Sequence, residues 1–167
     1  MIKNNALRLP LKQCLKSLVT FVICLIFCGS WSVAKNLQTG FKNYNAKLQI
    51  VDSGTKRITE FFVAIADNDE ERSRGLMYVE SLPLHCGMLF IMPSKQKISM
   101  WMKNTVIPLD MVFIDENDLI VDIKKMVKPL DLELVISAKE ANKVLEINAG
   151  LVKKFGIKIG NKVRYKL

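Results

Sequence analysis

Four side chains close together in the sequence are of types that bind polar ligands: Trp101, Lys103, Asn104 and Asp110. If residues 100–103 are extended, Trp101 and Lys103 share one face, and Met100 and Met102 share the other. A hairpin-like return of the chain would bring Lys103 and Asp110 together. An indole ring offers a stacking or cation–π surface, and an amide offers both donors and acceptors. The segment therefore predicts a shallow polar binding site.

Arg72 and Arg74 lie on a predicted short helix and are weaker candidates for the same site, where a guanidinium would grip an anion with two hydrogen bonds. The main four residues also fit a purely structural role. In that alternative, Lys103 and Asp110 form a partly buried ion pair, Asn104 sets the loop and Trp101 fills the core. The sequence alone leaves both interpretations open.

Nucleophilic catalysis has little support in this sequence. A serine hydrolase needs a histidine as base, and His85 is the only histidine and has no Gly-x-Ser-x-Gly elbow with it. A dyad of His85 with Cys86 would join sequence neighbours, whose side chains usually point apart. A hydrolase acting on a sugar or peptide through Asp110 stays open, because further acids follow closely in the sequence. No zinc spacing, phosphate loop or dinucleotide fingerprint is present, so we expect no metal and no cofactor.

Methionines form a second unusual feature, because five of them fall within 24 residues: Met88, Met92, Met100, Met102 and Met111. Thioethers suit Cu(I), and His85 and Cys86 are near in sequence, so a copper-binding protein is another alternative. Methionine also fills the interior of strands adaptably, which needs no metal.

Short strands must position these residues. With 167 residues the chain is long enough for one domain with a core of its own. Runs of β-branched and aromatic residues predict strands over residues 46–51, 58–66, 87–92, 97–103, 110–115, 119–127, 144–148 and 162–165. Strands and turns at this spacing indicate a mainly β fold, a compact sandwich or barrel-like domain with two short helices.

Turn and helix signals separate these runs. Residues 52–54 and 116–118 predict turns, and Pro93 is expected to stop the strand before it. Asp67, followed by Glu70, predicts the start of a short helix that ends near Gly75. Ser137 is expected to cap a second helix over residues 138–142, and residues 150–155 predict a helical turn.

The first 34 residues have the three-part plan of a secretory signal peptide. Four basic residues without an acid precede an apolar stretch over 18–28, and Ser32-Val33-Ala34 places small residues before a cleavage point. The uncharged run over 17–34 also leaves an uncleaved anchor open. Cleavage would leave a flexible arm over 35–45 and a single β domain over 46–167. We expect an exported protein, periplasmic or secreted, without stable membrane insertion after cleavage.

Cysteine and charge refine this picture. Cys86 would be the only cysteine after cleavage, so no intrachain disulfide is possible and a buried, inert thiol is the simplest interpretation. The formal charge of +9 is carried mainly by the two ends of the chain, since residues 35–146 hold 15 basic and 16 acidic side chains. A nearly neutral domain does not support nucleic-acid binding. The expected partner is a small polar or cell-envelope ligand, and the oligomeric state is not predicted.

Six segments are more specific than any of these patterns. They are Glu-Arg-Ser-Arg-Gly-Leu-Met at 71–77, Gly-Met-Leu-Phe at 87–90, Trp-Met-Lys-Asn-Thr at 101–105, Ile-Pro-Leu-Asp at 107–110, Phe-Ile-Asp at 113–115 and Val-Leu-Glu-Ile at 144–147. Together they resemble the domain-of-unknown-function 192 family over about residues 46–166. The resemblance implies a small, often exported bacterial or archaeal protein with a compact, mostly β fold and no established activity. We therefore predict an exported binding or accessory module of the cell envelope.

Overall fold

A computed structural model describes residues 44–52 and 56–166 of this chain. The predicted signal peptide, almost all of the predicted arm and most of the predicted 52–54 turn lie outside the described residues. Within the described part, no helix is long and apolar enough to cross a membrane.

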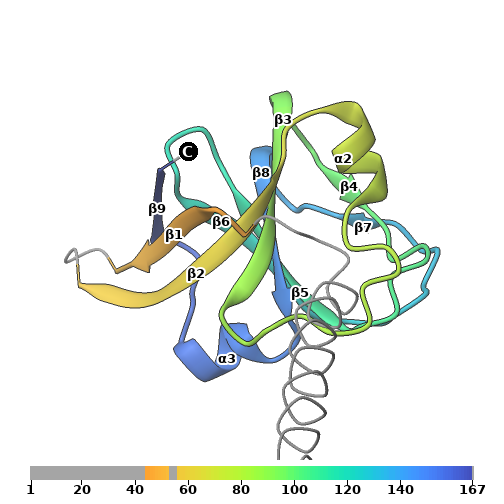
Figure 1. The fold of residues 1–167 in the computed structure, drawn as a ribbon. Helices are drawn as coiled ribbons and strands as arrows, with labels where there is room; N and C mark the ends of the chain where they lie inside the picture. The colour runs from red at the N-terminus through yellow and green to blue at the C-terminus, as the bar shows by residue number, and fades with distance from the viewer. Residues whose placement is uncertain (1–43, 53–55, 167) are drawn as a thin grey trace, which may run out of the picture. The chain divides into compact units, whose positions relative to one another are not determined.

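Seven strands form one mixed sheet, in the order β6-β5-β8-β3-β2-β1-β9 (Figure 1). All neighbours in this sheet are antiparallel except β2 and β3. The strands are β1 (Ala46–Val51), β2 (Arg57–Ala66), β3 (Cys86–Gln96), β5 (Leu109–Ile114), β6 (Ile120–Val127), β8 (Ala141–Asn148) and β9 (Lys162–Lys166). A second sheet pairs β4 (Ser99–Met100) with β7 (Val135–Ile136). The helices are α2 (Asp69–Arg74) and α3 (Leu151–Phe155).

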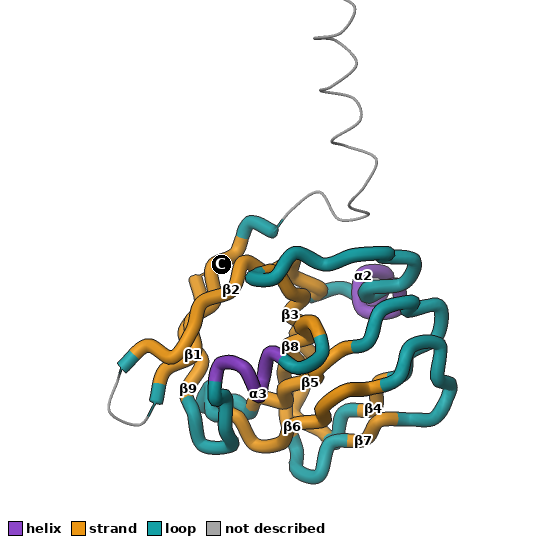
Figure 2. Tube along the Cα trace, turned by 90° about the horizontal axis from the view of Figure 1, so that it is seen from below, coloured by secondary structure: helices purple, strands orange, loops and turns teal. Residues whose placement is uncertain are grey.

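The large sheet curls until its two edge strands meet, as the view in Figure 2 shows. Leu119 forms a bridge with Lys162, and the Ile120 N–H donates to the Asn161 carbonyl at 2.9 Å. All seven strands send apolar side chains into one core inside the curl, and α3 adds Leu151 and Val152 to it. The expected mainly β, barrel-like domain with two short helices is confirmed.

A second apolar core lies on the outer face of β3, β8 and β5. Alternation along each strand explains it, because Leu145 and Ile147 face the first core while Val144 faces the second. This outer face is covered by the segment that follows α2 and by the chain around β4 and β7 (Figure 1). The outer layer is where the predicted site residues of the 72–103 region are found.

Four sequence predictions are wrong in local detail. The strand over 87–92 continues past Pro93 to Gln96, because the β3–β8 register shifts between Ile91 and Gln96 and the proline lies in that irregularity. The strand over 97–103 shrinks to β4, because the Met102 N–H turns away to donate to the Asp131 carbonyl.

The helix predicted over 138–142 does not form, because residues from Ala141 onward belong to β8 in the middle of the large sheet. Ser137 does not cap a helix. Its hydroxyl accepts from the Ile98 N–H at 2.9 Å and donates to the Lys139 carbonyl at 2.7 Å. The first helix is present but is capped by Asn68, whose side chain accepts from the Glu71 N–H, and not by Asp67.

Candidate functional site

A cavity of about 380 Å³ opens on the outer layer between four parts of the fold. Its walls come from α2 and the residues after it, from β3, and from residues 99–105, and one residue of β8 contributes to it. The lining residues are Asp69, Arg72, Ser73, Arg74, Gly75, Leu76, Met77, Phe90, Met92, Ser99, Met100, Trp101, Lys103, Thr105 and Glu146. The structure therefore brings four of the six predicted site residues together.

Trp101 and Lys103 are exposed at this cavity, while Met102 between them is fully buried. The alternation expected for this segment is therefore present, although the strand is shorter than predicted. The Lys103 ammonium lies 5.1 Å from the centre of the Trp101 ring, which is a cation–π contact. The side chain of Trp101 stays 45% exposed, so its ring is available to a ligand and does not plug the core.

Arg72 is held firmly at the cavity wall. Its guanidinium donates to the Asp69 carboxylate at 2.6 Å and to the Ile91 carbonyl at 2.9 Å, and its side chain is only 16% exposed. These bonds fasten α2 to β3 and compensate the positive charge of Arg72. Arg74, in the last turn of the same helix, is exposed and also lines the cavity.

Asn104 does not line the cavity but supports one of its walls. It adopts a left-handed backbone conformation with φ of 57°, and its carbonyl accepts from the Tyr78 N–H at 2.8 Å. Its side-chain amide lies 3.7 Å from the sulfur of Met77, a lining residue. An asparagine tolerates this conformation better than most residues, which explains its place in the loop.

Asp110 lies away from the cavity, so the expected approach of Lys103 and Asp110 does not occur. Its neighbours Leu109 and Met111 face the outer core, and alternation along β5 turns Asp110 to the opposite face. Asp110 is fully buried, and its two oxygens accept from the N–H groups of Met126 and Val152, each at 2.9 Å. Its carboxylate joins β6 and the start of α3 to β5, which is a structural role.

Glu146 is the lining residue that sequence reasoning missed as a site candidate. It lies on β8, directly opposite Met88 of β3 and Met111 of β5, and is only 4% exposed. Its carboxyl group forms no hydrogen bond or ion pair with the described residues. Among those residues, the Tyr44 hydroxyl is the only side-chain polar atom that is both fully enclosed and without a partner. The Glu146 oxygens have no partner either, so they are not fully enclosed and reach the cavity surface.

Burial raises the pKa of Glu146 to about 8, because a charged carboxylate is poorly solvated among methionines and Phe90. Arg72 pairs with Asp69 and Lys103 contacts the Trp101 ring, and neither forms an ion pair with Glu146. The signal in the sequence was an isolated acid in the run Val-Leu-Glu-Ile, whose alternation places it on a buried face.

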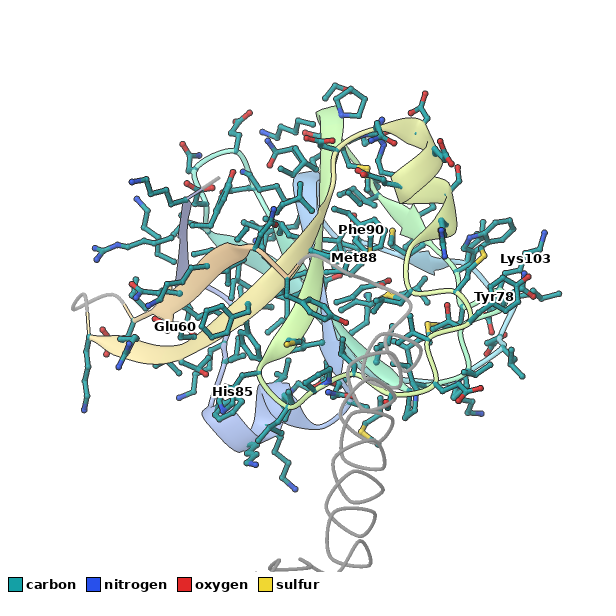
Figure 3. The ribbon with its side chains drawn as sticks, viewed as in Figure 1. Glu60, Tyr78, His85, Met88, Phe90 and Lys103 are labelled. Carbon is teal, nitrogen blue, oxygen red and sulfur yellow. The ribbon has the colours of Figure 1, made fainter. Side chains whose placement is uncertain are left out.

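The five methionines of the copper hypothesis gather in or against the outer core, and Cys86 packs against it too, but His85 does not join them. Met88, Met102 and Met111 are fully buried in the outer core. His85 lies beside α3, apart from Met88 and Phe90, with its ring 5.4 Å from that of Phe155 (Figure 3). Cys86 is a free, partly buried thiol whose pKa is raised by burial. No cluster of three His, Cys, Asp or Glu side chains suited to a metal occurs in the described residues.

Comparison with a family model shows the family, and two solved structures are similar to this chain. The family model DUF192, "Uncharacterized ACR, COG1430", matches residues 49–165. A solved structure titled a "putative transcription regulator" from Sinorhizobium meliloti 1021 is 31% identical, with a TM-score of 0.70 over 75% of this chain and 98% of that one. A protein of unknown function from Novosphingobium aromaticivorans DSM 12444 is 32% identical, with a TM-score of 0.67 over 71% and 83%. No curated protein matches. The chain therefore belongs to the uncharacterized DUF192 family.

Proposed function

We propose that this chain is a small-molecule binding module whose ligand occupies the cavity between α2, β3 and residues 99–105. The main supporting observation is the pairing of an exposed Trp101–Lys103 contact with the buried, unpartnered Glu146 in one cavity. A volume of about 380 Å³ is within the usual range for small-ligand sites, roughly 300–1,000 Å³. Apolar walls with a few convergent polar groups are the usual composition of such sites.

The fixed geometry of the walls also supports binding. Arg72 is bonded to two elements, and Asn104 holds the loop next to Met77, so the cavity exists before any ligand arrives. A preformed cavity reduces the entropy that ordering would otherwise cost on binding. Trp101 stays nearly half exposed in this arrangement, although an aromatic ring gains from being covered.

The proposal includes export to the cell envelope, where the ligand would be a polar or envelope-derived compound. It depends on the basic, apolar and small-residue regions of the first 34 residues. N-terminal sequencing of the protein recovered from cell fractions tests this part. A mature chain that begins at Lys35 in the exported fraction is the expected result, and an intact Met1 in the cytosolic fraction contradicts it.

Trp101→Ala tests the binding site. A thermal-shift panel of sugars, peptidoglycan fragments, amino acids and metal ions is followed by calorimetric titration of the compounds that stabilise the protein. Because Trp101 is exposed, we expect the variant to keep its unfolding midpoint and to lose binding about tenfold or more, as removal of a stacking contact does.

Phe62→Ala is a matched control, because Phe62 is 47% exposed but lies on β2 outside the cavity. Equal affinity in wild type and both variants would place the ligand elsewhere. Unfolding of Trp101→Ala, with Phe62→Ala intact, would favour the structural interpretation of Trp101. Stabilisation by Cu(I) alone, unaffected by Trp101→Ala, would point instead to the methionines.

A further inference from the structure

The two ends of the cavity differ in charge and in access to solvent. The inner end is Glu146, which is almost completely buried. The outer end includes Lys103, which is exposed and has no carboxylate partner among the described residues. Figure 3 shows Lys103 reaching outward, while Met88 and Phe90 lie in the interior. A ligand that fills this cavity therefore meets a carboxyl group inside and an ammonium group outside.

A buried carboxyl group without a partner calls for a positively charged or hydrogen-bonding group on the ligand. Burying an ionised group is costly unless it is paired. The residues opposite Glu146 are Met88 and Met111, which offer it no hydrogen-bond donor. A metal ion such as Ca²⁺ or Mg²⁺ fits poorly, because these ions need several oxygen ligands. Glu146 is the only carboxylate that the strands contribute to the lining of this cavity. A protonated amine, with one charge and apolar neighbours, fits better.

The outer end suits a carboxylate. Arg72 is already paired with Asp69, and Arg74 is engaged in an interaction of its own. The exposed cation that best meets a ligand anion at this end is therefore Lys103. Lys103 is positioned by its contact with the Trp101 ring, and an ammonium ion is a good donor to a carboxylate. The walls between the two ends include an apolar part, to which Leu76, Phe90 and Met92 contribute.

We infer that the cavity binds a small zwitterion, an α-amino acid with an apolar side chain, with its ammonium group on Glu146 and its carboxylate on Lys103. This inference rests on the proposed binding function and names its ligand class. The apolar walls would take the side chain of the amino acid. The matching of two opposite charges across the cavity gives both affinity and orientation.

This arrangement links binding to proton release. In the free protein Glu146 is mainly protonated below about pH 8, whereas pairing with an ammonium group requires its carboxylate form. Affinity should therefore increase, by up to about tenfold per pH unit, as pH rises toward about 8. The charged groups that share the cavity with Glu146 are Asp69, Arg72, Arg74 and Lys103, and the strands on either side present Met88 and Met111.

Calorimetry of the full chain with the twenty free amino acids, their N-acetyl derivatives and their amides tests the inference. N-acetylation removes the amine and amidation removes the carboxylate. We expect apolar amino acids to bind, N-acetylation to reduce affinity at least tenfold, and binding to release a proton at pH 7. Measurements in buffers of different ionisation enthalpy detect that proton in the wild type, without any variant.

Glu146→Gln should lose binding of the free amino acid and its pH dependence, and Lys103→Met should reduce the preference for the free acid over the amide. Glu116→Gln, at an exposed acid in the β5–β6 turn, is the control and should bind as the wild type does. Unfolding midpoints show that each variant is folded.

Two results would overturn the inference while leaving the proposed function intact. One is that N-acetyl derivatives bind as tightly as free amino acids and that their affinity falls above pH 8. Glu146 would then act in its protonated form, as a hydrogen-bond donor to an acceptor on the ligand. The other is binding of sugars or peptidoglycan fragments that Trp101→Ala abolishes, with no binding of any amine. Failure of every compound in both panels to bind would contradict the proposed function as well.

Discussion

Glu146 and Asp110 are two buried acids on neighbouring strands with opposite roles. The carboxylate of Asp110 accepts two backbone N–H groups, so its charge is compensated by the fold. Glu146 accepts none and faces the cavity. Buried polar groups are normally hydrogen-bonded, and an exception calls for an explanation, such as a ligand that supplies the partner.

The unpartnered Glu146 should make stability depend on pH. Its pKa is raised from 4.5 to about 8 in the folded state, so the folded state holds a proton that the unfolded state releases between these values. The contribution of Glu146 to stability is therefore full below about pH 4.5 and decreases as pH rises toward about 8, by up to ~1.4 kcal/mol per pH unit. Glu146→Gln should remove this slope. Denaturant unfolding of both proteins at pH 5, 6, 7 and 8 measures it.

The comparison between wild type and variant isolates Glu146 from other groups. Glu60 does not interfere, because its hydrogen bond from Gln49 and the cations beside it lower its pKa and move its titration below the window. If the free energy of unfolding had the same pH dependence in wild type and Glu146→Gln, Glu146 would be ionised or partnered in the folded protein. The cavity would then hold no buried, protonated carboxyl group.

Residue types predicted one part of the site and missed another. Trp101 and Lys103 were accessible to sequence reasoning, because alternation along a short segment decides which face each occupies. Asp110 was assigned to the wrong side, because its face depends on how β5 pairs with β6 and with β8, which is distant in sequence. Glu146 was hidden, because an acid in an apolar strand becomes informative only when its neighbours across the sheet are known.

At the scale of elements, hydrophobic patterning predicted strands and misjudged their ends. The strands β1, β2, β5, β6 and β9 begin and end within about a residue of the prediction. The errors lie at Pro93, over residues 97–103 and over residues 138–142. At Pro93 and over 138–142, sheet pairing overrides local signals. Central pairing of β8 with β3 and β5 extends that strand backward to Ala141, against a helix signal from Ser137.

The pairing of β3 with β8 requires a glycine at position 87, and this pairing places Glu146. A Cβ atom on Gly87 would lie 2.6 Å from the Glu146 carbonyl oxygen and 2.9 Å from Ile147 Cγ2. Backbone cannot move aside as a flexible side chain can, so the two strands would have to separate. We expect Gly87→Ala to destabilise the protein by about 1–3 kcal/mol, as overpacking does. Denaturant unfolding at fixed pH measures this.

Gly87→Ala should also weaken binding at the cavity, since it shifts the strand that carries Glu146. The matched control is Ala64→Gly on the neighbouring β2, which removes a methyl group and adds no contact. Its cost arises from backbone freedom and lost packing, and it should leave the cavity in place. Wild-type stability in Gly87→Ala would mean that β3 and β8 leave room for a methyl group between them.

At the scale of the molecule, the domain has two cores that share one sheet. The inner core fills the curl of the sheet, and the outer core holds the covering segments against β3, β8 and β5. A barrel-like or sandwich fold was predictable from the number and spacing of strands. The order of the strands, the parallel β2–β3 pair and the closure between β6 and β9 were not, because they depend on contacts between distant parts of the sequence.

Closure of the curl depends on the last strand. Beside its antiparallel pairing with β1, β9 is tied to the β5–β6 turn, where the Val163 N–H donates to the Asp118 carbonyl at 2.8 Å. Val163 is also fully buried in the inner core.

Removing residues 161–167 would therefore expose one edge of β1, open the inner core and break the contacts with β6. We expect the truncated chain to lose cooperative unfolding, and Val163→Ala in the full chain to remain folded but less stable by about 1–3 kcal/mol. Circular dichroism and thermal unfolding of the two proteins test this. A truncated chain with the thermal unfolding midpoint of the wild type would show that the inner core is stable without β9. Closure of the sheet would then not be needed for folding.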